Sequence, residues 1–152
     1  MSRARRHWLV KSEPAKYSWD QFVADGTTYW DGVRNPGARN NLQAMRVGDL
    51  VLYYHSNEGK EVVGIARVTK SAYPDPTSDD PRWVVVDLVP VQPVADPVTL
   101  KCIKADPSLR EIPLVRQSRL SVMELERRAF DRILALGQTR LRRVRNQEPL
   151  RR

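Results

Sequence analysis

Two apolar segments dominate the sequence, Leu50-Val51-Leu52-Tyr53-Tyr54-His55 and Val62-Val63-Gly64-Ile65-Ala66-Arg67-Val68. β-Branched and aromatic residues are typical of strands. The residues between the segments, Ser56-Asn57-Glu58-Gly59-Lys60, form a short polar loop that contains glycine, which predicts a β-hairpin. A glycine inside a strand marks a bulge or a close approach of another group, so we expect one of these at Gly64.

Further strands and helices are predicted on both sides of this hairpin. Strands are expected over residues 7–11 and 83–91, and helices over 19–24, after an N-cap at Ser18, and over 38–45. Ser121-x-x-Glu124 has the form of a capping box, which predicts a last helix with an apolar stripe from Val122 to Leu134. Prolines break residues 93–113 into short elements. The pattern predicts an α+β fold, a small bent and mostly antiparallel β-barrel with short flanking helices and a C-terminal helix.

The chain has 152 residues and a net charge of +8, which fits one domain with an uneven charge distribution. Residues 1–7 and 138–152 together carry the whole net charge, whereas residues 8–137 contain 17 basic and 17 acidic residues. We therefore expect a basic N-terminal tail (1–7), a neutral domain (8–137) and a flexible arginine-rich C-terminal tail (138–152). The tails suit phosphate contacts, and they equally suit a purely solubilising role.

Several classes of protein are disfavoured by the composition. One cysteine and two histidines give no disulfide framework and little for a metal site, and no 18-residue apolar run could span a membrane. The basic start lacks the apolar region of a secretory signal. Dinucleotide, P-loop, esterase and zinc-protease motifs are absent. We expect a cytoplasmic, monomeric protein without metal or cofactor, more consistent with a binding protein than with an enzyme.

Three loop-proximal clusters combine aromatic rings with hydrogen-bonding groups: residues 8–14, residues 30–40 and residues 53–57. Aromatic rings stack on nucleobases, and Ser and Asn can read the edge of a base. Arginine holds phosphate or stacks on a base. This inventory indicates a planar, polar ligand.

The three clusters belong to a longer series of distinctive stretches: Trp8-Leu9-Val10-Lys11-Ser12-Glu13-Pro14, Trp30-Asp31-Gly32-Val33-Arg34-Asn35 with Ala38-Arg39-Asn40, Gly48 to Ser56, Val63 to Ala66 with Ala72 to Thr77, Trp83 to Asp87, and Leu114 to Val122. In these stretches the sequence resembles the EVE-domain family. The resemblance spans about residues 7–137. It implies a PUA-like fold related to YTH domains, which read a methylated adenine in RNA through an aromatic cage. It also implies recognition of a modified base, chiefly a modified cytosine in DNA, with RNA as the other possible partner.

The resemblance assigns expected roles to single residues. Lys11 and Ser12 correspond to a Lys-Ser pair beside the YTH ligand, and Trp30 corresponds to a cage tryptophan. Either Trp83 or Tyr53 would form the second wall. The remaining candidates are Arg34 and Asn35 on the pocket loop, Arg39 beside it, and His55 and Ser56 at the end of the facing strand. Together they predict a non-enzymatic nucleic-acid-binding module that accepts a flipped, modified base.

Two other functions stay open. Related ASCH domains include amidohydrolases that act on acylated cytidine, and Lys11, Ser12 and Glu13 offer similar groups. Adjacent strand residues point to opposite faces, which argues against all three sharing one site. The third possibility is a protein-interaction module that uses residues 73–81 and the tails.

Overall fold

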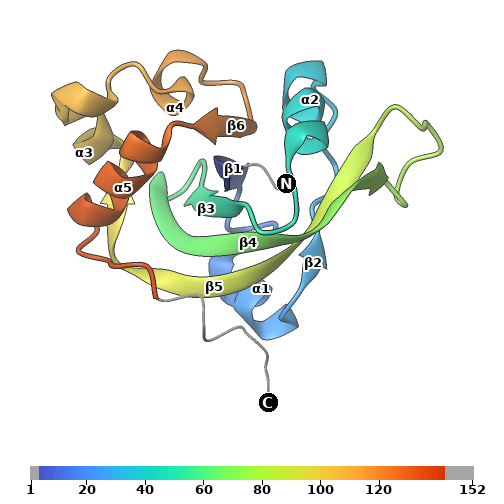
Figure 1. Ribbon diagram of the computed structural model, residues 1–152, viewed down its shortest axis with the longest axis horizontal. Coiled ribbons are helices and arrows are strands. Elements are labelled where there is room, and N and C mark those ends of the chain that lie inside the picture. The colour runs from blue at the N-terminus through green and yellow to red at the C-terminus, as the bar shows by residue number, and fades with distance from the viewer. Residues whose placement is uncertain (1–3, 143–152) are drawn as a thin grey trace.

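The computed structural model describes residues 4–142 and combines one six-stranded sheet with short helices (Figure 1). The elements are, in chain order, β1 (His7–Ser12), α1 (Trp19–Asp25), β2 (Thr28–Tyr29), α2 (Pro36–Ala44), β3 (Leu50–His55), β4 (Glu61–Pro74), β5 (Val84–Thr99), α3 (Leu100–Ala105), the 3-10 turn η1 (Pro107–Leu109), α4 (Pro113–Arg116), β6 (Val122–Leu125) and α5 (Arg127–Leu136).

The strands follow the order β2-β5-β4-β3-β1-β6, and every neighbouring pair is antiparallel except β1 and β3. The α+β class is therefore confirmed. The predicted barrel is an open, bent sheet: within residues 4–142 the edge strands β2 and β6 do not pair with each other. The parallel register places Ser12 of β1 opposite His55 of β3, so both strands end at the same place.

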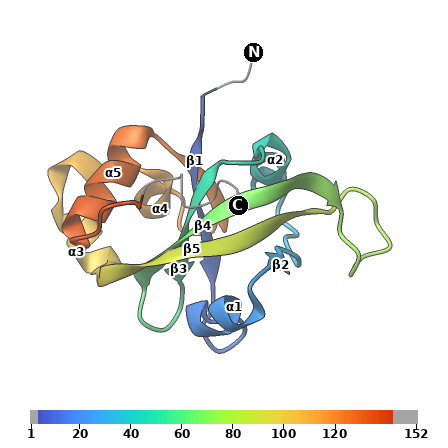
Figure 2. The ribbon, with the colours of Figure 1, turned by 60° about the horizontal axis from the view of Figure 1, so that its bottom comes forward.

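Both faces of the central strands are buried, which explains their nearly unbroken apolar runs. Trp8, Val10, Val51 and Tyr53 pack with residues of α1 and α2 on one face. Leu9, Leu50, Leu52 and Tyr54 pack on the other face with residues of α3, α4 and α5. Figure 2 shows α3, α4 and α5 gathered on one side of the molecule and α2 on the other.

The predicted close approach at Gly64 is confirmed. A Cβ atom at this position would lie 2.4 Å from Cζ3 of Trp19 in α1, so only glycine lets the helix pack against β4. The strand register also shifts beside Gly64. This contact fixes α1 under the hairpin.

The first two helices agree with the sequence. Ser18 caps α1 by accepting a hydrogen bond from the Gln21 N–H at 3.0 Å. Helix α2 begins at Pro36, two residues before the predicted start, because Asn35 is its N-cap and proline suits the first helical turn.

The predicted capping box at Ser121 and Glu124 is wrong. Residues Val122–Leu125 form β6, which pairs antiparallel with β1, and α5 begins only at Arg127. Glu124 accepts hydrogen bonds from the Arg6 guanidinium at 2.6 and 2.7 Å and does not cap a helix. The apolar stripe of the helix, including Phe130 and Ile133, is buried as predicted.

The predicted break at Pro93 is also wrong, because β5 continues to Thr99. Since β2 pairs with β5 only at residues 87 and 88, the distal part of β5 has a strand partner on its β4 side alone. The Ala95 and Asp96 N–H groups donate instead to Thr139 and Gly137, in the segment after α5. A proline has no N–H to donate and is tolerated on such an unpaired strand edge. The short elements α3, η1 and α4 follow as expected.

Within residues 4–142, both basic ends contact the domain. His7 already belongs to β1, and Thr139 accepts a hydrogen bond from the Ala95 N–H at 2.7 Å. Most of the predicted arginine-rich tail, residues 143–152, lies outside the described residues.

Candidate functional site

A cleft of about 850 Å³ opens where β1 and β3 end together. The Ser56 N–H donates to the Ser12 carbonyl oxygen at 2.9 Å and so extends the strand pairing to the floor of the cleft. Four segments form its walls: residues 11–17, 28–34, 56–57 and 118–121. The parallel β1–β3 pair joins residues 11–17 to residues 56–57. The Lys11 N–H donates to the Ser121 carbonyl oxygen at 2.9 Å and so joins residues 118–121 to the same place.

Lys11 and Ser12 both line the cleft, as the resemblance implies. The Ser12 hydroxyl donates to the Tyr17 carbonyl oxygen at 2.9 Å, which leaves its oxygen able to accept a hydrogen bond. The Lys11 ammonium crosses to the opposite wall and donates to the Ser118 carbonyl oxygen at 2.9 Å. Burial lowers the pKa of Lys11.

Trp30 lies in the cleft wall, but its side chain is only 7% exposed. Tyr53 lies behind it, fully buried, with the two rings edge to face at 5.4 Å between centroids. The Tyr53 hydroxyl donates to the Tyr17 carbonyl oxygen at 2.6 Å, and burial raises the pKa of Tyr53. Tyr53 therefore supports Trp30 and does not line the cleft; Tyr17 and Tyr29 supply the other aromatic lining.

The loop that carries Trp30 is held by a buried carboxylate. Asp75 accepts hydrogen bonds from the Gly32 N–H at 3.2 Å and from Arg34 Nη1 at 3.1 Å, and its other oxygen accepts two bonds from Thr77. Burial alone would raise the pKa of Asp75, but the bonds from Thr77, Gly32 and Arg34 together hold it below its ordinary value. Gly32 has a φ of +78°, the left-handed conformation that favours glycine.

Trp83 lies outside the cleft, at its rim, among three arginines. The guanidinium carbons of Arg34, Arg39 and Arg82 lie 5.7, 5.8 and 5.5 Å from the centre of a Trp83 ring. These distances permit cation–π attraction. Arg34 lines the cleft as predicted, and within residues 4–142 the buried Nε of Arg39 has no hydrogen-bond partner.

Asn35 and His55 have structural partners, whereas Ser56 lines the cleft. The Asn35 side-chain oxygen accepts the Ala38 N–H at 2.9 Å as the cap of α2. His55 Nε2 accepts the Trp19 N–H at 3.0 Å, and burial lowers the pKa of this histidine. Both groups position elements around the cleft.

A second, smaller cavity of about 360 Å³ adjoins the cleft and shares Ser118 and Arg119 with it. Asn35 and Gln117 line this extension. A chain-like ligand that enters the cleft could therefore continue past Arg119.

Four residues that shape the cleft are not among the predicted site residues: Tyr17, Asp75, Ser118 and Arg119. The last three lie in stretches that carry the family resemblance, but no role is assigned to them. The only local sign is at Asp75, which stands between two prolines and before Thr77, a sequence typical of a side-chain-capped turn. The others reach the cleft through contacts between distant segments.

Neither a metal centre nor a membrane helix is found in the described part of the chain. No group of three or more His, Cys, Asp or Glu side chains among residues 4–142 could hold a metal ion. Over the same residues, no helix combines the length and apolar character needed to cross a bilayer.

Comparison with known proteins identifies clear relatives. The model of the EVE domain matches residues 6–136. Thymocyte nuclear protein 1 of Gallus gallus is 35% identical over 164 residues, which cover 86% of this chain and 68% of that protein. The crystal structure of Atu2648 from Agrobacterium tumefaciens has a TM-score of 0.87 at 42% identity, covering 88% of this chain and 94% of that one.

Two further structures contain modified nucleic acid. Human THYN1 in complex with 5-methylcytosine-containing DNA has a TM-score of 0.82 at 32% identity, covering 89% of this chain and 99% of that chain. The YTH domain of Zygosaccharomyces rouxii MRB1, in complex with N6-methyladenosine RNA, has a TM-score of 0.58 at 16% identity, covering 91% and 89%. The second likeness is one of fold, and together the two confirm a PUA-like architecture.

Proposed function

The chain belongs to the EVE-domain family, and we propose on this premise that it is a nucleic-acid-binding module that recognises a modified base, a modified cytosine in particular. The base would leave its stack and enter the cleft at the ends of β1 and β3. Extruding a base costs a few kcal/mol, and less when it is already single-stranded.

The observation that carries the proposal is the cleft itself. It brings Lys11, Ser12 and Trp30 together in a protein whose relative, human THYN1, was crystallised with 5-methylcytosine-containing DNA. A volume of about 850 Å³ is ample for a single nucleotide and lies within the usual range of ligand sites.

The walls suggest how the base would be held. The Ser12 oxygen is free to accept a hydrogen bond from an exocyclic amine, and the Lys11 ammonium can donate to a carbonyl on the base edge. Trp30, with Tyr17 and Tyr29, would give aromatic contact, although the small exposed fraction of Trp30 limits stacking on its face. Arg34 and Arg39 at the rim would contact the nucleic-acid backbone.

The test is fluorescence anisotropy with matched oligonucleotides, in DNA and RNA form, that carry cytosine or 5-methylcytosine. Lys11→Gln is expected to weaken binding of the modified strand about tenfold, the effect of losing one good polar contact. Trp30→Phe keeps an aromatic ring but removes part of the contact surface, so it is expected to weaken binding less. Lys101→Gln on α3, remote from the cleft, is the matched control. Equal affinity for modified and unmodified strands, together with unchanged affinity in both cleft variants, would refute the proposal.

One observation favours an enzymatic alternative. Lys11, Ser12 and Glu13 all line the cleft. The alternation of side chains along a strand argued against a shared site, but β1 ends at Ser12 and Glu13 follows in a turn, so the alternation does not extend to Glu13. An amidohydrolase of the ASCH type is therefore the second candidate. Incubation with N4-acetylcytidine, followed by mass spectrometry, would show loss of the acetyl group, and loss that persists in Lys11→Gln would rule out this site.

A further inference from the structure

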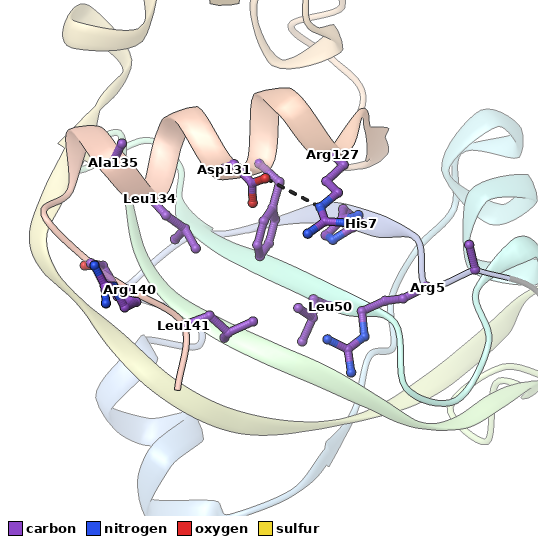
Figure 3. Close-up of a pocket in the computed structure, with 12 residues that line it drawn as sticks. Arg5, His7, Leu50, Arg127, Asp131, Leu134, Ala135, Arg140 and Leu141 are labelled. Carbon is purple, nitrogen blue, oxygen red and sulfur yellow. Dashed lines mark ion pairs between the residues drawn. The ribbon is translucent and has the colours of Figure 1, made fainter. Parts of the chain in front are cut away.

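A third cavity, of about 470 Å³, is shown in Figure 3 and lies at the opposite end of β1 from the cleft. It lies beside His7 at the start of the strand, whereas the cleft begins at Ser12. At about 3.3 Å per residue, the six-residue strand separates the two places by about 17 Å. The two cavities could therefore be filled at the same time.

The floor of this cavity is apolar. It consists of Leu50, Phe130, Leu134 and Leu141, and the ring of His7 packs on Phe130 with 4.6 Å between centroids. These side chains come from β1, β3, α5 and the segment after α5, which form one continuous surface. Such a floor favours a ligand with an apolar body, because covering the apolar side chains removes their surface from contact with water.

The rim is cationic and only partly neutralised. Arg127 forms an ion pair with Asp131, with 3.5 Å between Nε and Oδ2. Arg5 and Arg140 flank Leu50 and Leu141 in Figure 3. Across residues 4–142, neither of these two guanidiniums forms an ion pair or a side-chain hydrogen bond. Two positive charges thus border the apolar floor, and neither has a charged partner among these residues.

We propose that this cavity binds a small organic anion that has an apolar body, such as an aryl or short alkyl carboxylate. The body would cover Leu50 and Phe130, and the anionic group would accept hydrogen bonds from Arg5, which lies beside Leu50, while Arg140 on the other side of the floor adds to the positive potential. A bare inorganic anion would leave the floor exposed to water, and a neutral apolar molecule would leave both guanidiniums unused. The near-absence of hydrogen-bonding groups in the floor also disfavours a nucleobase, which needs partners for its polar edge.

The proposal is tested by NMR titration of the ¹⁵N-labelled protein with three probes. Naphthalene-2-carboxylate carries both features, naphthalene-2-methanol only the apolar body, and acetate only the charge. The carboxylate is expected to shift the amides of Leu50, Phe130 and Ala135 and to bind at least about tenfold more tightly than either other probe, because a hydrogen bond to a charged group is worth about that factor. Equal binding of the alcohol, or shifts confined to the cleft, would overturn the proposal.

Charge-removing variants sharpen the test. Arg5→Gln is expected to weaken carboxylate binding about tenfold, and Arg140→Gln, on the other side of the floor, is expected to weaken it less, whereas Arg110→Gln, an exposed arginine after η1, should leave it unchanged. Equal weakening in Arg110→Gln would show a nonspecific charge effect and would refute the site. A final arm replaces the probes with a single-stranded oligonucleotide: if it shifts the same amides more strongly than the carboxylate, the arginines serve a phosphate backbone and the proposal fails.

Discussion

Replacing Asp75 by Asn should destabilise the protein by about 2–3 kcal/mol. The Asp75 side chain is fully buried, and each of its oxygens accepts two hydrogen bonds. In asparagine one oxygen becomes an NH₂ group. Turned toward Gly32 and Arg34 it would face two donors, whereas toward Thr77 it would face the Thr77 N–H and a hydroxyl that can rotate to accept. The better orientation therefore leaves the Thr77 N–H without its acceptor and Arg34 without a charged one. Two bonds to a charged acceptor, at about 1.5 kcal/mol each, give about 3 kcal/mol, and water can replace part of the contact to the half-exposed Arg34.

Urea denaturation at pH 7 measures this difference directly. Asp79→Asn is the matched control: Asp79 lies in the same loop and is exposed, so its replacement should change the free energy of unfolding by less than about 0.5 kcal/mol. For a chain of this size the Asp75 variant should also melt about 8 °C lower than the wild type.

The pH dependence gives a second, independent readout. Because hydrogen bonds outweigh burial and hold the pKa of Asp75 below its ordinary value, its ionised form stabilises the fold at every pH above about 4. That contribution is lost as the pH falls through the native pKa. The difference between wild type and Asp75→Asn should therefore shrink below pH 4. Stability equal to that of Asp79→Asn, or a difference that stays constant down to pH 2.5, would refute this account of the loop.

Two further perturbations test the packing and the charge network. Gly64→Ala should lower the free energy of unfolding by about 1–3 kcal/mol, because the added Cβ would meet the Trp19 ring, and by much less in a Trp19→Leu background. Equal losses of stability in the two backgrounds would exclude the clash. Hydrogen bonds from Ser108 and Arg132 lower the pKa of Asp106 to about 2, so Arg132→Gln should raise the midpoint of the Asp106 titration measured by carboxyl ¹³C NMR. An unchanged midpoint would show that the 2.7 Å ion pair has no effect on this pKa.

The central hairpin could be predicted from the sequence because its information is local. Leu50–His55 and Val62–Val68 have strand composition, and the polar loop between them has the right length for a hairpin. The close approach at Gly64 could also be predicted, since glycine inside a strand is unfavourable unless a neighbouring group packs where a side chain would be. The tertiary packing agrees with these local preferences.

The region around Val122 could not be read in the same way. Val122, Met123 and Leu125 suit a helix face or a strand with both faces buried, and the preceding Ser121 suggested a helix cap. The segment forms a strand because it pairs with the free edge of β1, which lies more than a hundred residues earlier. This pairing also brings Arg6 beside Glu124. A pairing over that distance leaves no local pattern.

The same limit applies to the cleft. Lys11, Ser12, Trp30, Arg34 and Ser56 were predicted, and the structure brings them together. Tyr53, His55 and Asn35 have side chains that hold neighbouring elements in place. Asp75 was missed because its partners Gly32 and Arg34 lie more than 40 residues away.

Charge alone gives this cleft little power to select a ligand. Lys11 already donates to Ser118, Lys16 lies 4.0 Å from Glu13, and Arg34 is paired with Asp75. Among the cations that line the cleft in residues 4–142, Lys11 and Arg119 have no carboxylate partner, and Asp31 lines the same cleft.

Selection must therefore come from shape and from hydrogen bonds to the base edge. Burying one added methyl group contributes about 0.8 kcal/mol, which is about a fourfold preference. A measured preference near fourfold for 5-methylcytosine over cytosine would mean that packing against the cleft wall is sufficient. Cytosine and 5-methylcytosine present the same hydrogen-bonding groups, so a preference of a hundredfold would require the methyl group to seat the base more deeply. The unmodified base would then leave the Ser12 hydroxyl or the Lys11 ammonium without its partner.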